Sequence, residues 1–317
     1  MGKKDASLKQ WFKDNRRFAD LFNGACFDGK QIIKPEELKD LDGESGFVLR
    51  DKYGKQRYEQ RYRDVIKGWR GLVLRGVLGI ELQDKVHYAM PIKNMMMDSL
   101  SYTDQMKMIW DNIPDTKKKE MIGTPDYFSR FRKDDKLCPV ITLVFYDGDD
   151  WDGATQLFDM FEFDATKADV ELMGYIKKYV PNYHINLFCP TQSQNLEVFK
   201  TDLQTVFGML KSRKDKETLR NYIYDNREYF SCLDYDSCNA IVALLGTDKL
   251  FRDELMVKGD NDMCKAIDDL YEDGIELGRE QGQLDMIINL IKKNRLSIEL
   301  GAEELGISVE ELELKLA

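Results

Sequence analysis

Three polar residues between positions 63 and 83 have the types and spacing needed for metal-assisted chemistry. Asp64 precedes a short apolar segment, and Glu81 and Gln83 follow in the alternating sequence Gly-Ile-Glu-Leu-Gln. Because side chains two apart on a β-strand share a face, Glu81 and Gln83 are expected to point the same way. With Asp64 on an adjacent strand, two carboxylates and an amide would meet. Magnesium prefers one or two carboxylates and keeps several waters, and metal-bound water can attack a phosphodiester.

Helical and strand patterns on both sides of these residues predict the elements that position them. Residues 8–22 have the apolar spacing of an amphipathic helix, and residues 95–110 carry a second apolar stripe without proline. Strands are predicted at 32–35, 65–69, 72–74, 77–82, 140–146 and 184–188. The unbroken β-branched and aromatic run at 140–146 is typical of a buried strand. This order predicts an α/β fold with a central mixed sheet flanked by helices.

The same residues belong to an ordered series of segments. The series is Phe18 to Asn23, Arg63 to Lys67, Gly79 to Gln83 followed by His87 to Pro91, and Val140 to Tyr146. It resembles the recombination-promoting nuclease (Rpn) family, a transposase-like group within the PD-(D/E)XK nuclease superfamily, over roughly residues 10–200. The resemblance implies a PD-(D/E)XK nuclease-like core of order α-β-β-β-α-β. It also implies a DNA endonuclease linked to recombination and mobile elements.

The resemblance assigns roles to individual residues. Asp64 and Glu81 would bind Mg²⁺ (or Mn²⁺), helped by the carbonyl oxygen of Leu82. Gln83 would stand where related nucleases have lysine, as the third member of the catalytic set. An amide can orient water but brings no charge, so a nearby lysine is expected to supply it.

Several residues could complete or replace these roles. Lys67 or Lys85 could supply the missing positive charge, and Lys93, shortly after a Met-Pro pair, could contact phosphate. Asp20 on the first predicted helix is either a third acidic contributor or part of a solvated helix face.

A purely structural explanation of the three polar residues stays open. Asp64 could be a strand-edge acid paired with Arg61 or Arg63. The alternation at Glu81 and Gln83 could mark one solvated face of a sheet, which is common in proteins.

The net charge of −10 is unevenly distributed along the chain. Residues 250–317 hold 17 acidic and 8 basic residues, a net of −9, whereas residues 50–75 hold nine basic and three acidic residues. Phosphate binding depends on local charge, so this basic stretch around Asp64 predicts a DNA surface, although such runs are often simply solvated. The DNA contacts are expected from Arg57, Arg61, Arg63, Lys67 and Lys93.

Three regions are predicted along the chain. Residues 1–200 form the nuclease-like domain, residues 201–260 a helical region, and residues 261–317 a charged helical tail. The tail ends in two short helical patterns that resemble a helix-turn-helix, but residues 296–317 contain six glutamates and a single basic residue. Phosphate would repel such a surface, so a partner protein or homo-oligomer is expected there instead.

Other classes of protein lack support in the sequence. No apolar run approaches the ~20 residues of a membrane span and no signal peptide is evident, which predicts a cytoplasmic protein without membrane contact. The six cysteines are scattered without the spacing of a zinc site and are expected to be reduced. Walker and Gly-x-Ser-x-Gly motifs are absent. The acidic run at 147–153 lacks two oxygen ligands of an EF-hand loop.

The sequence therefore favours a metal-dependent endonuclease that hydrolyses phosphodiester bonds in DNA. The alternative is a catalytically inactive nuclease fold that binds DNA or protein. Gln83 in the lysine position and the acidic tail both favour that alternative.

Overall fold

A computed structural model describes residues 3–41, 44–50, 56–70, 74–162, 167–246, 262–293 and 295–316. The chain divides into two compact units, Met1–Tyr222 with Asp236–Gly246, and Ile223–Tyr235 with Thr247–Ala317. The first unit contains the sheet and extends beyond the boundary expected near residue 200. No helix among the described residues is long and apolar enough to cross a membrane. The six cysteines are free, and Cys232 among them is exposed.

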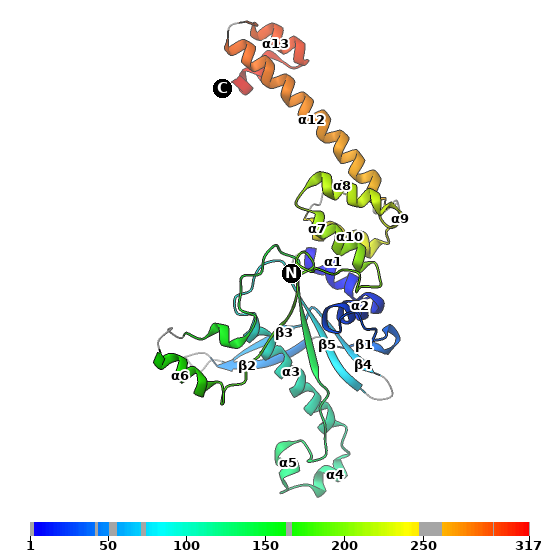
Figure 1. Cartoon of the computed structure of the whole chain (residues 1–317), viewed down its shortest axis with the longest axis vertical. Coiled ribbons are helices and arrows are strands. Elements are labelled where there is room, and N and C mark those ends of the chain that lie inside the picture. The colour runs from blue at the N-terminus through cyan, green and yellow to red at the C-terminus, as the bar shows by residue number, and fades with distance from the viewer. Residues whose placement is uncertain are drawn as a thin grey trace. The chain divides into compact units, whose positions relative to one another are not determined.

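The first unit is built on a five-stranded mixed sheet in the order β1-β4-β5-β6-β7 (Figure 1). The strands are β1 (Leu38–Asp40), β4 (Val65–Arg70), β5 (Leu74–Gln83), β6 (Val140–Tyr146) and β7 (Asn186–Phe188). Neighbours are antiparallel from β1 to β5 and parallel from β5 to β7. The expected α/β architecture with a central mixed sheet is therefore confirmed, and β5 is its middle strand.

Helices cover both faces of this sheet. Phe12 of α1 (Lys3–Phe12) packs against Phe145 with ring centroids 5.2 Å apart. Asp98 of α3 (Met90–Asp111) accepts a hydrogen bond from Thr142 at 2.6 Å. Thr142 and Phe145 are three residues apart on β6 and so point to opposite faces. Because β5 is covered on both sides, its residues 76–82 are buried, the charged Glu81 included.

The opening helical pattern is divided between two helices, so the single helix expected at 8–22 is wrong. Helix α1 ends at Phe12 and α2 (Asn15–Cys26) follows after a two-residue break. The Asp14 carboxylate accepts hydrogen bonds from the backbone N–H groups of Arg16 and Arg17, at 2.9 and 3.0 Å. Aspartate is a preferred N-cap because it satisfies N–H groups that have no partner within the helix.

The remaining strand and helix expectations have mixed outcomes. The strand at 140–146 is confirmed residue for residue, and the helix at 95–110 is confirmed but begins earlier. The strand expected at 32–35 is wrong, because a 3₁₀ turn, η1 (Pro35–Glu37), precedes β1 there. Residues 72 and 73 of another expected strand lie outside the described residues.

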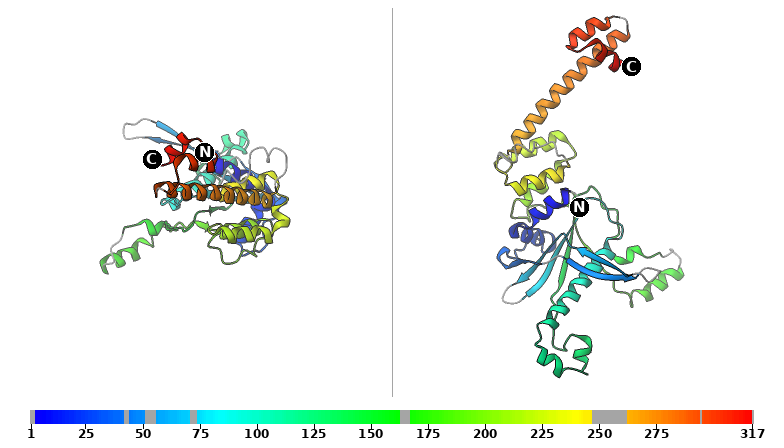
Figure 2. Two further views of the ribbon diagram at one scale, coloured as in Figure 1. Left: turned by 90° about the horizontal axis from the view of Figure 1, so that it is seen from above. Right: turned by 180° about the vertical axis from the view of Figure 1, so that it is seen from behind.

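Part of the basic stretch forms a hairpin that the sequence patterns did not predict. Strands β2 (Glu44–Arg50) and β3 (Gln56–Tyr62) follow β1 and precede β4 in the sequence, and they form a separate two-stranded antiparallel sheet (Figure 2). Short helices occupy the polar excursion after α3 and the region before β7, namely α4 (Asp115–Glu120), α5 (Pro125–Ser129), η2 (Leu157–Met160) and α6 (Lys167–Ile176).

Beyond residue 200 the described chain is helical, as expected. The helices are α7 (Leu203–Ser212), α8 (Lys216–Asp225), α9 (Arg227–Phe230), α10 (Tyr235–Leu245), α12 (Met263–Lys292), α13 (Ile298–Leu305) and α14 (Val309–Leu316). Helix α7 packs on the sheet through Phe207, whose ring lies 5.7 Å from Phe145. In the second unit, Ser297 caps α13, and Gly301 lies so close to Ile291 that no larger residue fits without a shift.

Candidate active site

Asp64 and Glu81 lie near one another at one end of β4 and β5. The antiparallel register pairs Val65 with Ile80, and the two acids are the residues that flank this pair. Asp64 accepts a hydrogen bond from the backbone N–H of Leu82, at 2.8 Å. The charge of Asp64 is near enough to raise the pKa of Glu81. The two acids are therefore neighbours, and a shared ion stays a prediction.

Glu81 is almost fully buried and only partly paired. Its side chain is 1% exposed, and Oε2 lies 2.7 Å from Nζ of Lys93 on α3. Oε1 has no hydrogen-bond partner among the described residues. Burial is the largest cause that raises the pKa of Glu81, Lys93 lowers it, and the Asp64 carboxylate raises it again. The ion pair with Lys93 therefore offsets only part of the cost of burying the Glu81 charge.

A second lysine forms an ion pair with the Asp64 carboxylate. Nζ of Lys9, on α1, lies 2.7 Å from Oδ1 of Asp64, and both side chains are largely buried. Each acid therefore carries its own ammonium group, and the two lysines come from α1 and α3, the helices that cover opposite faces of the sheet. Sequence reasoning did not identify Lys9, because nothing in the spacing of α1 indicates which strand end it reaches.

Gln83 is directed at the backbone and forms no hydrogen bond with either carboxylate among the described residues. Its Nε2 donates to the carbonyl oxygen of Leu82 at 2.7 Å. That oxygen is the one expected as a third metal ligand, and a carbonyl oxygen has a second lone pair for another contact.

The donors at this site fit a hard divalent cation. Two carboxylates are neighbours, Oε1 of Glu81 lacks a partner among the described residues, and the next residue along β5, Leu82, has a carbonyl oxygen that could serve as a ligand. The described residues contain no group of three or more His, Cys, Asp or Glu that could hold a metal. Two carboxylates are nevertheless the number that Mg²⁺ commonly uses, with water completing its shell.

Two of the residues expected to contact DNA are buried, so those predictions are wrong. Arg63 is 5% exposed and Lys67 is 0% exposed. Lys67 donates to the carbonyl of Lys13 at 2.8 Å and pairs with Asp40, on the α1–α2 side of the sheet. It therefore supplies no charge to the Asp64–Glu81 site.

Arg63 belongs to a buried network centred on Asp98, which sequence reasoning also missed. Nη2 of Arg63 lies 2.7 Å from Oδ1 of Asp98, and the Tyr183 hydroxyl donates to Oδ2 at 2.6 Å. Arg63 also donates to Thr142, and the absence of a side chain at Gly79 leaves space for the guanidinium. The network fixes the start of β4 against α3, immediately beside Asp64.

The remaining residues expected to contact DNA or metal differ in where they lie. Arg57 and Arg61 lie on β3, but their side chains lie outside what the structure describes. Lys93 lies at the site itself, paired with Glu81. Asp20 is neither a site residue nor solvated: it is 3% exposed and accepts from the backbone N–H groups of Lys200 and Thr201.

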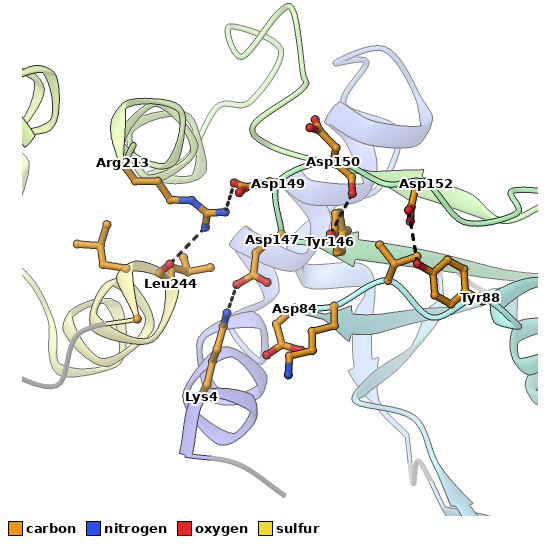
Figure 3. Close-up of a pocket in the computed structure, with 15 residues that line it drawn as sticks. Lys4, Asp84, Tyr88, Tyr146, Asp147, Asp149, Asp150, Asp152, Arg213 and Leu244 are labelled. Carbon is orange, nitrogen blue, oxygen red and sulfur yellow. Dashed lines mark hydrogen bonds and ion pairs between the residues drawn. The ribbon is translucent and has the colours of Figure 1, made fainter. Parts of the chain in front are cut away.

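The acidic run after β6 lines a cavity of about 720 Å³ (Figure 3). Its charges pair with one another: Lys4 lies 2.7 Å from the buried Asp147, and Arg213 lies 3.3 Å from Asp149. Burial raises the pKa of Asp147 and Lys4 lowers it. Two aspartates of the run, Asp147 and Asp149, are therefore balanced by basic side chains.

No family model matches this chain, and no curated protein and no solved structure does either. The likeness to the Rpn family therefore depends on the residues and their order alone.

Proposed function

We propose that this chain is a metal-dependent DNA endonuclease with a PD-(D/E)XK-type core, of the Rpn kind and linked to recombination and mobile elements. One observation carries the proposal: Oε1 of Glu81 is buried without a partner among the described residues, and Asp64 lies near enough to raise the pKa of Glu81. A second observation supports it. Helices, three antiparallel strands, a helix and a parallel strand follow in the order that the resemblance implies, with β2 and β3 inserted as a hairpin.

The residues of the site have distinct roles in this proposal. Asp64, Glu81 and the Leu82 carbonyl would hold Mg²⁺ or Mn²⁺. The bound ion supplies a water nucleophile with a lowered pKa and neutralises charge on the phosphate. Lys93, once released from Glu81, places a positive charge beside the reacting phosphate, which the Gln83 amide cannot do. Gln83 orients water from the neighbouring position.

DNA would approach across the basic part of the chain. With Arg63 and Lys67 buried, Arg57 and Arg61 on β3 and Lys93 at the site are the remaining contacts of the expected set. Contacts with the phosphate backbone carry little sequence information, so binding should be weakly selective and should weaken steeply with salt. We also propose that the protein acts in the cytoplasm.

The proposal is tested by nicking of supercoiled plasmid over a titration of Mg²⁺ and of Mn²⁺. Wild type should cut only with a divalent cation, and Asp64→Asn and Glu81→Gln should each lower the single-turnover rate by roughly 10²-fold or more. Asp84→Asn is the matched control, because Asp84 is an exposed acid just after β5. It should cut at the wild-type rate. Equal activity of wild type and Glu81→Gln would overturn the enzyme assignment.

One observation favours a second candidate, an inactive nuclease fold that binds DNA or protein. Glu81 is 1% exposed, and both carboxylates are held by lysines. Such a module would show no cleavage with any divalent cation. It would retain DNA or partner binding in Glu81→Ala, without a need for metal.

We further propose that residues 263–317 mediate self-association or bind a protein partner. Their negative charge disfavours nucleic acid. Light scattering of the full chain and of a chain ending at residue 255 tests self-association. The same oligomeric state in both would remove it.

A further inference from the structure

Helix α3 places a row of side chains against the sheet, and one of them is an amide without partners. The buried members of the row are Met90, Asn94, Met97, Ser101 and Gln105. Asn94 is 0% exposed, and neither Oδ1 nor Nδ2 has a hydrogen-bond partner among the described residues. An amide removed from water without hydrogen bonds destabilises a fold, so such a group calls for an explanation.

Gln105, in the same row, is the natural comparison. Its Nε2 donates to the carbonyl of Cys138 at 3.1 Å, and its Oε1 accepts from the N–H of Cys138 at 2.7 Å. Gln105 thus ties the segment before β6 to α3, which accounts for its burial. Asn94 has no comparable structural task.

The neighbours of Asn94 place it beside Glu81. Met90, one turn before it, packs with Val144, and Asp98, one turn after it, bonds to Thr142. Asn94 therefore faces the stretch of sheet between Thr142 and Val144. Val144 is paired in register with Glu81. The preceding residue of α3, Lys93, contacts Glu81 directly.

Three buried polar atoms without a hydrogen-bond partner among the described residues thus belong to one end of α3 and the strand beneath it. They are Oε1 of Glu81 and both polar atoms of Asn94. A carboxylate oxygen and an amide oxygen are ligand types of hard cations, and an amide N–H can hold a water of the hydration shell. The surroundings on the sheet side, Met90 and Val144, are apolar and offer no alternative partner.

We propose that Asn94 is a further residue of the Asp64–Glu81 cation site and positions the waters of the bound ion. This inference depends on the proposed function, because it needs a divalent cation at Glu81. In the metal-free protein the amide is a destabilising feature, and in the loaded protein it gains its partners. The same residue should therefore have opposite effects on metal-free stability and on metal affinity.

The test uses three variants of the full chain and two measurements, the metal-free Tm and the Kd for Mn²⁺ by calorimetric titration. Asn94→Leu should raise the metal-free Tm and weaken Mn²⁺ binding by about 10- to 100-fold. This is the usual effect of losing a residue that hydrogen-bonds to the ligands of a metal ion. Asn94→Asp should lower the metal-free Tm and tighten Mn²⁺ binding. Gln105→Leu, the matched control, should lower the Tm and leave the Kd unchanged.

The outcomes separate this inference from the proposed function. If wild type binds no Mn²⁺, the cation site itself is wrong, and the role of Asn94 is overturned with it. If wild type binds Mn²⁺ and Asn94→Leu binds it with the same Kd, only the role of Asn94 is overturned. Should Asn94→Leu fail to fold, Asn94→Asp decides: an unchanged or weaker Mn²⁺ affinity in that variant also overturns it.

Discussion

Glu81 of β5 and Lys93 of α3 form a 2.7 Å ion pair that involves only one oxygen of the carboxylate. The other oxygen is buried without a partner among the described residues, and the Asp64 carboxylate lies nearby with a lysine of its own. Two like charges held together in a buried setting oppose folding unless a cation is close. A divalent ion and the two lysines would therefore compete for the same two carboxylates.

The first prediction concerns the pH dependence of stability. Burial raises the folded-state pKa of Glu81 above its ordinary value of 4.5. Between these two values the folded state binds more protons than the unfolded state, so this group lowers stability as pH rises through that window. Glu81→Gln, which cannot ionise, should gain stability relative to wild type at pH 8. Its advantage should shrink as the pH falls toward 4.5.

Urea denaturation of both proteins at several pH values measures that difference. Exposed Glu120→Gln is the control and should differ from wild type by less than about 0.5 kcal/mol throughout. A difference in unfolding free energy between Glu81→Gln and wild type that does not change with pH would contradict the raised pKa of Glu81.

The second prediction concerns Lys93. Lys93→Met leaves a buried carboxylate without its cation, which should cost about 3–5 kcal/mol of unfolding free energy without metal. A saturating divalent cation should restore much of that loss, because the ion replaces the ammonium group. Cleavage by the loaded variant should still fall by roughly 10²-fold, since the positive charge is lost from the transition state.

Chemical denaturation with and without Mg²⁺, together with plasmid nicking, measures these effects. Lys107→Met is the matched control on the same helix, because Lys107 is 65% exposed. It should change neither quantity. A Lys93 variant that cuts as fast as wild type would exclude the proposed role.

The third prediction concerns the Asp98 network. Asp98→Ala leaves the buried guanidinium of Arg63 and the Tyr183 hydroxyl without their shared acceptor. We expect a loss of about 3–5 kcal/mol in unfolding free energy, the range for breaking a buried pair. Asp104→Ala, at a partly exposed aspartate of the same helix, should lose less than about 1 kcal/mol. Similar losses in the two variants, measured by urea denaturation, would show that the network is not a main support of the site.

The sequence predicts the centre of the sheet well, for a physical reason. Strand β6 is an unbroken apolar run, and such a run has few alternatives to a buried strand. The closeness of Asp64 and Glu81 follows from two neighbouring strands joined by a short connection, which is a local relationship. The hairpin of β2 and β3 was missed because β3 consists mostly of polar and charged residues.

The partners of the site were not predictable in the same way. Lys9 and Lys93 reach the two acids from helices, and residue spacing along a helix does not state which strand end it will meet. The basic run around Asp64 suggested a solvated surface, yet Arg63 and Lys67 are buried because Asp98 and Asp40 supply their counter-charges. Such long-range pairing exists only in the folded chain.

The central claim is that Asp64 and Glu81 share one divalent cation, and a crystal soaked in Mn²⁺ tests it most directly by anomalous scattering. The account predicts one anomalous peak in contact with an oxygen of Asp64 and with Oε1 of Glu81. Lys9 and Lys93 should have withdrawn from the two carboxylates. A soaked crystal in which both lysine pairs persist and no peak lies between the acids would contradict it.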